Sequence, residues 1–333
     1  MTPITRNGAL ALEIQRLLAL IWVYISGWFN FVFFSRKTIY TYQEPNCNSR
    51  WQPNISFSRN IRNQMMNTNQ GHVNAFCDRA RFRDLVETLL GSQYLPRAFY
   101  LSPHLTDIPW KSFPKEFVAK VTHGSGGLIG VWSGVSKKVS LPDSGDAAAW
   151  RRYWVNPDRF VESRAITILR ASLESNYAER PGKLMERGYL DAKPQILVEE
   201  LLLMPNLELA TQTALYCFNG IPKFIRVSMR DKNQSRSFAW KSIDWTTLPF
   251  FQASRQKPFV NQDELEKPDL LKDMIDIAST LSSGLEFARV DVYNLVSRIV
   301  VGEVTLYPSG GNCLFVPLKY NRLISEFWQP NVR

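Results

Sequence analysis

The sequence predicts a mixed α+β fold, and three observations support this class. Short apolar or alternating runs typical of β-strands follow one another from residue 116 onward. Segments with apolar residues at helical spacing lie before and between these runs. At 333 residues, with 45% hydrophobic and 21% charged side chains, the chain can bury a core without disulfides or metals. The same proportions exclude a mainly disordered chain, a collagen-like repeat and a coiled coil.

The most apolar segment of the chain is residues 17–34, which carry no charge and are flanked by Arg16 and Lys37. Its length is just enough for a transmembrane helix. A secretory signal peptide is disfavoured, because bulky aromatics and charges follow where a small-residue cleavage site is expected. A buried or interfacial helix is the alternative, since a glycine and an asparagine interrupt the run. We expect residues 1–45 to form an apolar helix that associates with a membrane or packs on the protein.

Residues 47–74 are rich in Asn, Arg and Gln, and they predict an irregular, basic, exposed connection. Residues 78–90 then have the apolar spacing of a helix, with Gly91 placed to end it. Four prolines break the next stretch into loops.

The second half of the chain predicts strands separated by two further helices. The helices are expected at residues 159–175 and 268–281, the second with Pro268 in its first turn. Asn219-Gly220 predicts a hairpin turn, because both residues accept positive φ. The predicted strands are residues 116–121, 127–132, 195–203, 213–217, 223–227, 287–293 and 299–304.

The charge and the metal-binding residue types limit the classes of function. A net charge of +10 predicts an anionic partner, such as a nucleotide, an acidic glycan, nucleic acid or a membrane surface. The four cysteines include no Cys-x-x-Cys pair, and the three histidines include no pair at metal-ligand spacing. A zinc site and a disulfide framework are therefore disfavoured, and a reducing cytosol fits best.

One lysine lies inside an apolar strand and precedes a glycine-rich loop. Lys120 is followed by His123, Gly124, Ser125, Gly126 and Gly127. A buried lysine needs a partner, and such a loop lets backbone N–H groups approach a phosphate closely. The order differs from a P-loop, in which the lysine follows the glycines. The segment predicts a polyphosphate site, with a plain hairpin as the alternative.

Two further groups of charged residues end or follow apolar strands. Glu199 and Glu200 leave one strand, where they can accept hydrogen bonds from a nucleoside or simply face solvent. Alternation places Arg289 and Asp291 on one face of a later strand. If the next strand pairs with it as a hairpin, Asp291 and Glu303 converge on a site suited to Mg²⁺. A structural ion-pair network is the alternative.

The order of these motifs resembles the TupA-like ATP-grasp family, named for teichuronopeptide synthesis. The similar segments are FPKEFVAKVTHGSGG, ILVEELL, YCFNGIPKFIRV, the Ile243-Asp244-Trp245 turn, KPDLLKDMIDIASTLSSGLEFARVDVYN and GEVTLYPSGG, between about residues 78 and 317. The resemblance implies an ATP-grasp fold, with two lobes of mixed or antiparallel sheets around a nucleotide cleft. It implies a helical or irregular region at 46–115 and lobes at 116–200 and 201–333.

The resemblance also implies a role for each motif residue. Lys120 and the loop from His123 to Gly127 would bind the phosphates of ATP. Glu199 or Glu200, with the backbone of Leu201, would hold the adenine, and Glu208 would contact the ribose. Asp291, Glu303 and Thr305 would bind Mg²⁺, and Arg289 would steady the transferred phosphoryl group.

Two departures from the family pattern put parts of this assignment in doubt. Many ATP-grasp enzymes have an asparagine where this chain has Thr305, although the TupA-like family shares the threonine. The family usually shows Asp-Tyr-Lys where this chain has Gln212-Thr213-Ala214. The second departure removes charges that would contact the nucleotide or the acceptor.

The resemblance implies an ATP-dependent carboxylate–amine ligase of cell-surface polysaccharide synthesis. Its substrates would be ATP, an amino acid or amine, and an anionic glycan or a nucleotide-linked or lipid-linked sugar. We expect a cytoplasmic protein, with the inner face of the plasma membrane as a further partner and no nucleic acid. Two alternatives remain, a kinase or other glycan-modifying transferase on the same fold and a non-catalytic glycan-binding protein.

Overall fold

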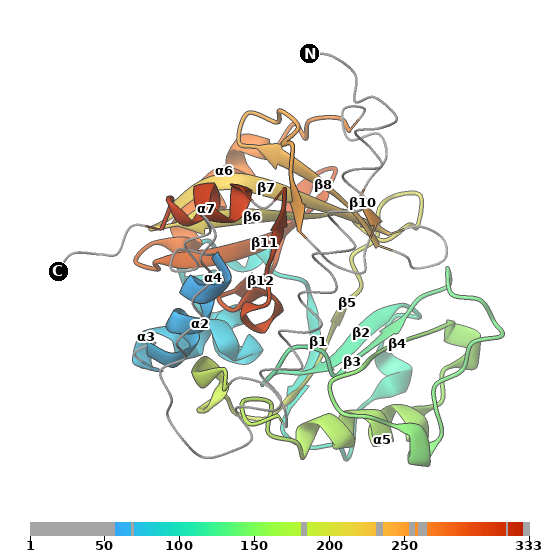
Figure 1. The fold of residues 1–333 in the computed structure, drawn as a ribbon. Helices are drawn as coiled ribbons and strands as arrows, with labels where there is room; N and C mark the ends of the chain where they lie inside the picture. The colour runs from blue at the N-terminus through green and yellow to red at the C-terminus, as the bar shows by residue number, and fades with distance from the viewer. Residues whose placement is uncertain are drawn as a thin grey trace.

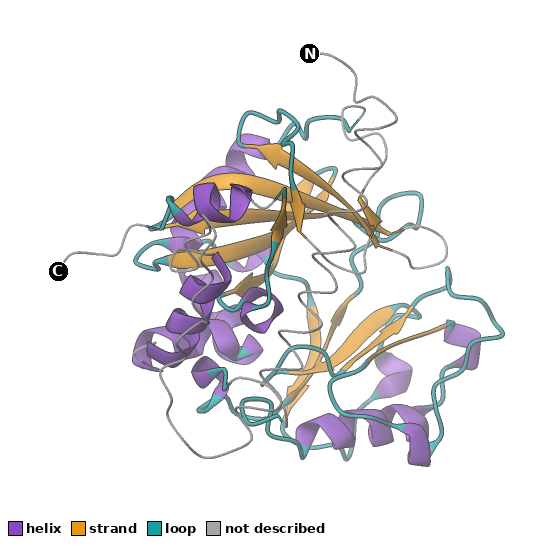
Figure 2. Ribbon diagram, in the orientation of Figure 1, coloured by secondary structure: helices purple, strands orange, loops and turns teal. Residues whose placement is uncertain are grey.

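The structure is a computed structural model that describes residues 57–67, 70–180, 185–230, 236–252, 257–258, 265–317 and 319–328. The apolar segment 17–34 lies outside these residues. Within the described ranges, no helix is long and apolar enough to cross a membrane. The described chain forms two lobes, each built on a sheet with helices against it (Figure 1). Helices and strands are mixed along the chain (Figure 2), as the α+β prediction requires.

The smaller lobe contains a five-stranded sheet in the order β1-β5-β2-β3-β4. Helix α5, Glu162–Leu173, packs against this sheet and buries Ala165, Ile168 and Leu169. β2 is antiparallel to both β3 and β5, whereas β3 and β4 are parallel. The strands are β1 Ala98–Ser102, β2 Phe117–Val121, β3 Leu128–Val131, β4 Arg152–Val155 and β5 Ile196–Glu200.

The larger lobe contains a six-stranded sheet in the order β10-β8-β7-β6-β11-β12. Helix α6, Leu271–Ser282, packs on one face of it. Asn219 and Gly220 both have positive φ and join β6 to β7, as predicted. The strands are β6 Gln212–Phe218, β7 Ile221–Arg230, β8 Arg236–Ser242, β10 Lys257–Pro258, β11 Phe287–Leu295 and β12 Arg298–Thr305.

The opposite face of the larger sheet is divided between an aromatic core and a polar region. Phe57 packs edge-on against Phe287, with ring centroids 5.1 Å apart, and against Phe315 at 5.4 Å. Phe315 belongs to a two-stranded sheet of β9, Phe251–Gln252, and β13, Phe315–Val316. Helix α7, Lys319–Ser325, follows β13.

The prediction of an irregular segment at residues 47–74 is wrong for its described part. Residues 57–67 form α2, Phe57–Asn67, and α3 spans Gln70–Cys77. Phe57, Ile61 and Met65 are spaced four residues apart, so they share one helix face, and all three are buried. The polar residues between them concealed this spacing.

Helix α4, Arg79–Leu89, begins at Asp78, whose carboxylate accepts hydrogen bonds from the backbone N–H groups of Ala80 and Arg81. This capping agrees with the helix predicted at residues 78–90.

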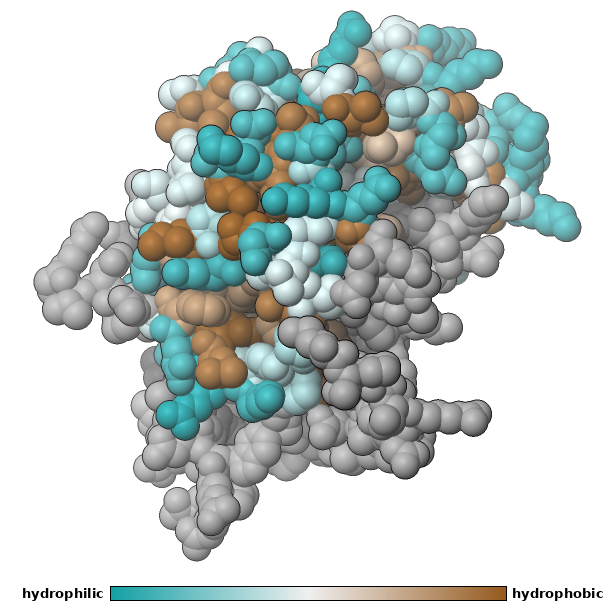
Figure 3. Space-filling view, turned by 90° about the horizontal axis from the view of Figure 1, so that it is seen from above, coloured by the Kyte–Doolittle hydropathy of each residue, from teal (hydrophilic) through white to brown (hydrophobic). Residues whose placement is uncertain are grey.

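Seen from above, apolar side chains lie in small groups separated by hydrophilic ones (Figure 3).

Candidate active site

Strands β11 and β12 pair in the register that the predicted metal site requires. Asp291 lies directly opposite Glu303, and Arg289 lies opposite Thr305. Directly opposed residues in antiparallel strands point to the same face of the sheet. The four side chains therefore meet on the face that lies away from α6.

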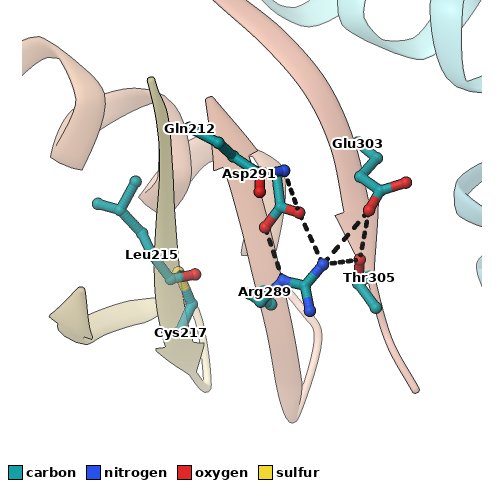
Figure 4. A network of polar contacts seen from close by, with 7 residues as sticks. All are labelled: Gln212, Leu215, Cys217, Arg289, Asp291, Glu303 and Thr305. Atoms are coloured by element: carbon teal, nitrogen blue, oxygen red, sulfur yellow. Dashed lines mark hydrogen bonds and ion pairs between the residues drawn. The ribbon is translucent and has the colours of Figure 1, made fainter. Parts of the chain in front are cut away.

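These side chains form a continuous polar network (Figure 4). Arg289 donates from Nε to Asp291 Oδ1 and from Nη2 to Oδ2, both at 2.6 Å. Nη2 also donates to Thr305 Oγ1 at 2.9 Å and lies 3.3 Å from Glu303 Oε1. Gln212 Nε2 donates to Asp291 Oδ2 at 2.9 Å. Gln212 stands at one of the positions where the chain departs from the family pattern, and its amide hydrogen-bonds one of the proposed metal ligands.

Burial and charge act in opposite directions on the three ionisable groups of this network. Burial raises the pKa of Asp291 above its usual range and outweighs the opposing effect of Arg289. Burial alone would also raise the pKa of Glu303, but Arg289, Arg79 and Arg152 lower it to about 2. The carboxylates of Asp291 and Glu303 raise the pKa of Arg289 above its ordinary value against the effect of burial. Arg289 is therefore a permanent cation at this site.

The facing lobe contributes Lys120 from β2. Its ammonium group forms an ion pair with Glu199 of β5, and Glu199 also pairs with Arg83 of α4 at 3.3 Å. The Lys120 and Glu199 side chains are only 12% and 9% exposed. Burial lowers the pKa of Lys120, and the carboxylate of Glu199 opposes this shift. The sequence predicted that the buried lysine needs a partner, and the structure shows that this partner is Glu199. The family resemblance had implied adenine binding for Glu199 or Glu200.

Glu200 connects the two lobes. Its carboxylate accepts a hydrogen bond from Arg298 of β12 at 2.6 Å. Leu201, the next residue, is buried in a small apolar cluster with Val118 and Trp132. An adenine at this hinge would therefore meet an apolar surface.

The glycine-rich loop is packed against aromatic side chains. A Cβ at Gly124 would come within 2.5 Å of the Trp150 ring and 2.7 Å of the Tyr177 ring. Gly126 has φ +95°, and a Cβ there would lie 2.0 Å from the Trp150 carbonyl oxygen. His123 is buried beside Trp150, and burial lowers the pKa of its imidazole. The close approach of these neighbours requires glycine at positions 124 and 126.

Arg79 is a functional candidate that the sequence analysis missed. Its guanidinium donates to the carbonyl oxygens of Val121 and Gly124, so it holds the glycine-rich loop. Its charge also contributes to the pKa shifts of Lys120 and Glu303. Arg79 is the first residue of α4, directly after the Asp78 cap. A basic residue at the start of a helix was the only feature of the sequence that could have indicated its role.

Charged groups of the two lobes lie near enough to shift each other's pKa values. The carboxylate of Glu303 opposes the lowering of the Lys120 pKa, and Arg152 of β4 helps to lower the pKa of Glu303. The Glu208 side chain accepts a hydrogen bond from Asn206 in its own turn, and the adjacent Leu209 packs against the apolar cluster of Leu201.

Comparison of the sequence with models of known protein families identifies the family of this chain. A model of the TupA-like ATP-grasp family matches residues 59–328. The chain belongs to the TupA-like ATP-grasp family. This TupA-like chain therefore has the ATP-grasp fold. A search of curated proteins found no match.

Several solved structures are similar to this TupA-like protein at low sequence identity. The ATP-grasp ligase PsnB complexed with minimal precursor is 11% identical, with a TM-score of 0.36 over 72% of this chain and 54% of that chain. D-alanine-D-alanine ligase from Helicobacter pylori is 11% identical, with a TM-score of 0.40 over 78% and 60% of the two chains. C-terminally truncated Cdc123 from Schizosaccharomyces pombe is 11% identical, with a TM-score of 0.37 over 78% and 92%. The chain thus spans about half the length of PsnB.

The ATP-grasp family implies Mg²⁺ and ATP, and the side chains present fit both. Among the described residues, no group of three or more His, Cys, Asp or Glu side chains could hold a metal by itself. Mg²⁺ is usually bound by one or two carboxylates together with substrate phosphates, so Asp291 and Glu303 suffice. Lys120, Arg79 and Arg289 are cations near these carboxylates that could face the phosphates. Arg289 donates to both oxygens of Asp291, so a metal at Asp291 would share these oxygens with the guanidinium or displace it.

Proposed function

We propose that this TupA-like protein joins a carboxylate to an amine in the synthesis of a cell-surface polysaccharide. ATP would phosphorylate the carboxylate to an acylphosphate and release ADP. The amine would then attack the acyl carbon, forming an amide and releasing phosphate. The substrates proposed are an amino acid or amine and a uronic acid or amino sugar, carried on a glycan, a nucleotide or a lipid.

One observation supports the ATP-dependent step more than any other. The ion pair of Glu200 with Arg298 joins the two lobes. The Glu303 carboxylate of the larger lobe lies near enough to Lys120 in the smaller lobe to oppose the lowering of its pKa by burial. A triphosphate with its Mg²⁺ would lie between Lys120 and Glu303, the metal neutralising phosphate charge when bound. Phosphoryl transfer depends mostly on positioning and on electrostatic stabilisation, and this arrangement supplies both.

The proposed roles of the chain's own residues follow from their positions. Lys120, Arg79 and the loop from His123 to Gly127 would bind the phosphates. Asp291, Glu303 and Thr305 would hold the metal, and Arg289, released from Asp291, would contact the transferred phosphoryl group. Glu200 and Leu201 would border the adenine, and Glu199 would keep Lys120 in place.

The net charge supports an acidic glycan or an anionic membrane surface as partner. The chain has 40 Lys and Arg residues against 30 Asp and Glu residues, and the proposed nucleotide site uses only Lys120, Arg79 and Arg289 among the cations. The remainder is available to attract an anionic acceptor, although electrostatic attraction alone does not select one.

The experiment is an ADP-release assay with a panel of uronic acids, amino sugars and amino acids. We expect ADP release that requires Mg²⁺ and both an acid and an amine, and that is lost in Lys120→Ala and Asp291→Ala variants that still fold. ADP release without an amine would favour a kinase or another glycan-modifying transferase. Failure to bind ATP with Mg²⁺ would favour a non-catalytic binding protein.

A further inference from the structure

A second arginine lies on the same sheet face as the proposed metal ligands. Arg226 of β7 is directly opposite Ala214 of β6, which in turn is opposite Asp291 of β11. Adjacent strands are about 4.8 Å apart, so Arg226 and Asp291 are separated by about 10 Å along the sheet. Only the methyl group of Ala214 stands between them.

Arg226 differs from the other buried arginines of the site in having no counter-ion. It is 9% exposed, its guanidinium lies 4.8 Å from the centroid of the Phe238 ring, and its Nε has no hydrogen-bond partner. Arg83 and Arg289 each pair with a carboxylate. Among the described residues, Arg226 makes no ion pair, and its Nε is buried without a partner, whereas its two terminal nitrogens are not among the buried unsatisfied atoms. A buried cation left in this state costs stability unless a ligand completes it.

Tyr216 is a second unsatisfied donor in the same neighbourhood. The side chain is fully buried, and its hydroxyl has no partner among the described residues. Burial raises the pKa of Tyr216, while the positive charges of Arg226 and Arg289 oppose the shift. The hydroxyl is therefore within electrostatic range of both arginines.

We propose that the Arg226 guanidinium and the Tyr216 hydroxyl form an oxyanion subsite for the second substrate. Both groups donate hydrogen bonds, and a carboxylate or phosphate supplies the acceptors and the negative charge they lack. The binding of an oxyanion at this subsite does not depend on the proposed function. Only the identification of that oxyanion with the carboxylate-bearing acceptor rests on it.

The position of the subsite favours the acceptor over the nucleotide. Arg298 of β12, the edge strand of the larger sheet, pairs with Glu200 of the smaller lobe, so the phosphate-binding residues of that lobe meet the sheet at this edge. Arg226 lies on the other side of Asp291, two strands further into the sheet. Arg289 lies between the two regions, where a phosphoryl group would pass from ATP to the acceptor.

The test uses two variants of the subsite and one control. Arg226→Met keeps the length of the side chain and removes its charge, and Tyr216→Phe removes only the hydroxyl. Lys223→Gln is the control, because Lys223 is a cation on the same strand whose ammonium lies over the Phe327 ring. Isothermal titration measures the binding of malonate, inorganic phosphate, Mg·ADP and Mg·ATP to each full-length protein.

We expect Arg226→Met to weaken malonate and phosphate binding about tenfold or more, the effect of losing a charged hydrogen bond. Tyr216→Phe should weaken both by a smaller factor. In both variants, the affinity for Mg·ADP and the ratio of Mg·ATP to Mg·ADP affinity should stay within about twofold of the wild-type values. The control Lys223→Gln should leave the affinities for all four ligands unchanged. The thermal unfolding midpoint of Arg226→Met should be equal to or higher than that of the wild type, because an uncompensated buried charge is removed.

Other results would overturn the proposal. Unchanged malonate and phosphate affinity in Arg226→Met would show that no oxyanion binds there. Loss of the preference for Mg·ATP over Mg·ADP would assign Arg226 to the γ-phosphate and not to the acceptor. A lower unfolding midpoint with weaker binding of all ligands would make Arg226 a structural residue. Failure of the proposed function would appear separately, as absent ADP release with malonate binding intact.

Discussion

Replacing Glu199 by glutamine should destabilise the fold far more than replacing Lys120 by methionine, although the two side chains form one ion pair. Glu199 is the common partner of Lys120 and Arg83, and it is 9% exposed. Glu199→Gln leaves two buried cations without a carboxylate, a change that costs about 3 to 5 kcal/mol. Lys120→Met leaves the pair of Glu199 and Arg83 intact, so we expect a loss of about 1.5 kcal/mol or less.

The same two variants separate stability from ligand binding. Urea unfolding gives the free energy of unfolding, and titration with Mg·ADP gives the affinity. Lys120→Met should lose most of its Mg·ADP affinity while it remains folded. Lys272→Gln serves as the control, because it breaks an exposed ion pair with Asp276 on α6, on the other face of the sheet. If Lys120→Met is destabilised as much as Glu199→Gln and binds Mg·ADP normally, Lys120 is a structural residue and the phosphate assignment is wrong.

Three further variants test other parts of the structure. Asp291→Asn should bind Mg²⁺ and nucleotide more weakly, and it should lose about 3 kcal/mol of stability because the buried Arg289 loses its main counter-ion; equal affinity for Mg·ADP would contradict the metal assignment. Glu303 has a pKa of about 2, below its ordinary 4.5, so it stabilises the fold above about pH 4.5 and this contribution disappears as the pH falls toward 2. The free energy of unfolding, measured with urea at each pH, should therefore fall less in Glu303→Gln than in the wild type between pH 5 and about pH 3. An equal fall in the two proteins would refute this. Gly126→Ala should lower the free energy of unfolding by more than about 1 kcal/mol, because the positive φ of Gly126 and the Trp150 carbonyl oxygen leave no room for a Cβ. An unchanged urea midpoint would mean that the loop can move to accept the methyl group.

The chemically important strands could be predicted from the sequence because their residue patterns are local. β2, β5, β11 and β12 are apolar runs with charged residues at fixed places, and alternation alone puts Arg289 and Asp291 on one face. The hairpin of β11 and β12 then brings Glu303 opposite Asp291. The family resemblance added the order of these motifs, and the match of the family model over residues 59–328 confirmed it.

Contacts between distant segments could not be predicted in this way. α2 looks polar because its apolar residues are four apart, and its burial depends on aromatic partners more than 150 residues away, such as Phe287. β8 was missed because it has only three apolar residues, 238–240, between polar ones, too few to be recognised as an apolar run. The pairing of Glu199 with Lys120 and Arg83 joins three separate elements, and no local pattern specifies it.

The most direct test of the account is the Mg²⁺-dependent binding of ATP to the wild-type protein and to Asp291→Asn. Isothermal titration with ATP is performed in Mg²⁺ and again in EDTA. The account predicts tight binding by the wild type only with Mg²⁺, and a smaller Mg²⁺ dependence in Asp291→Asn. Equal ATP affinity for both proteins, with and without Mg²⁺, would contradict the assignment of the cleft between Lys120 and Glu303 to a metal-bound nucleotide.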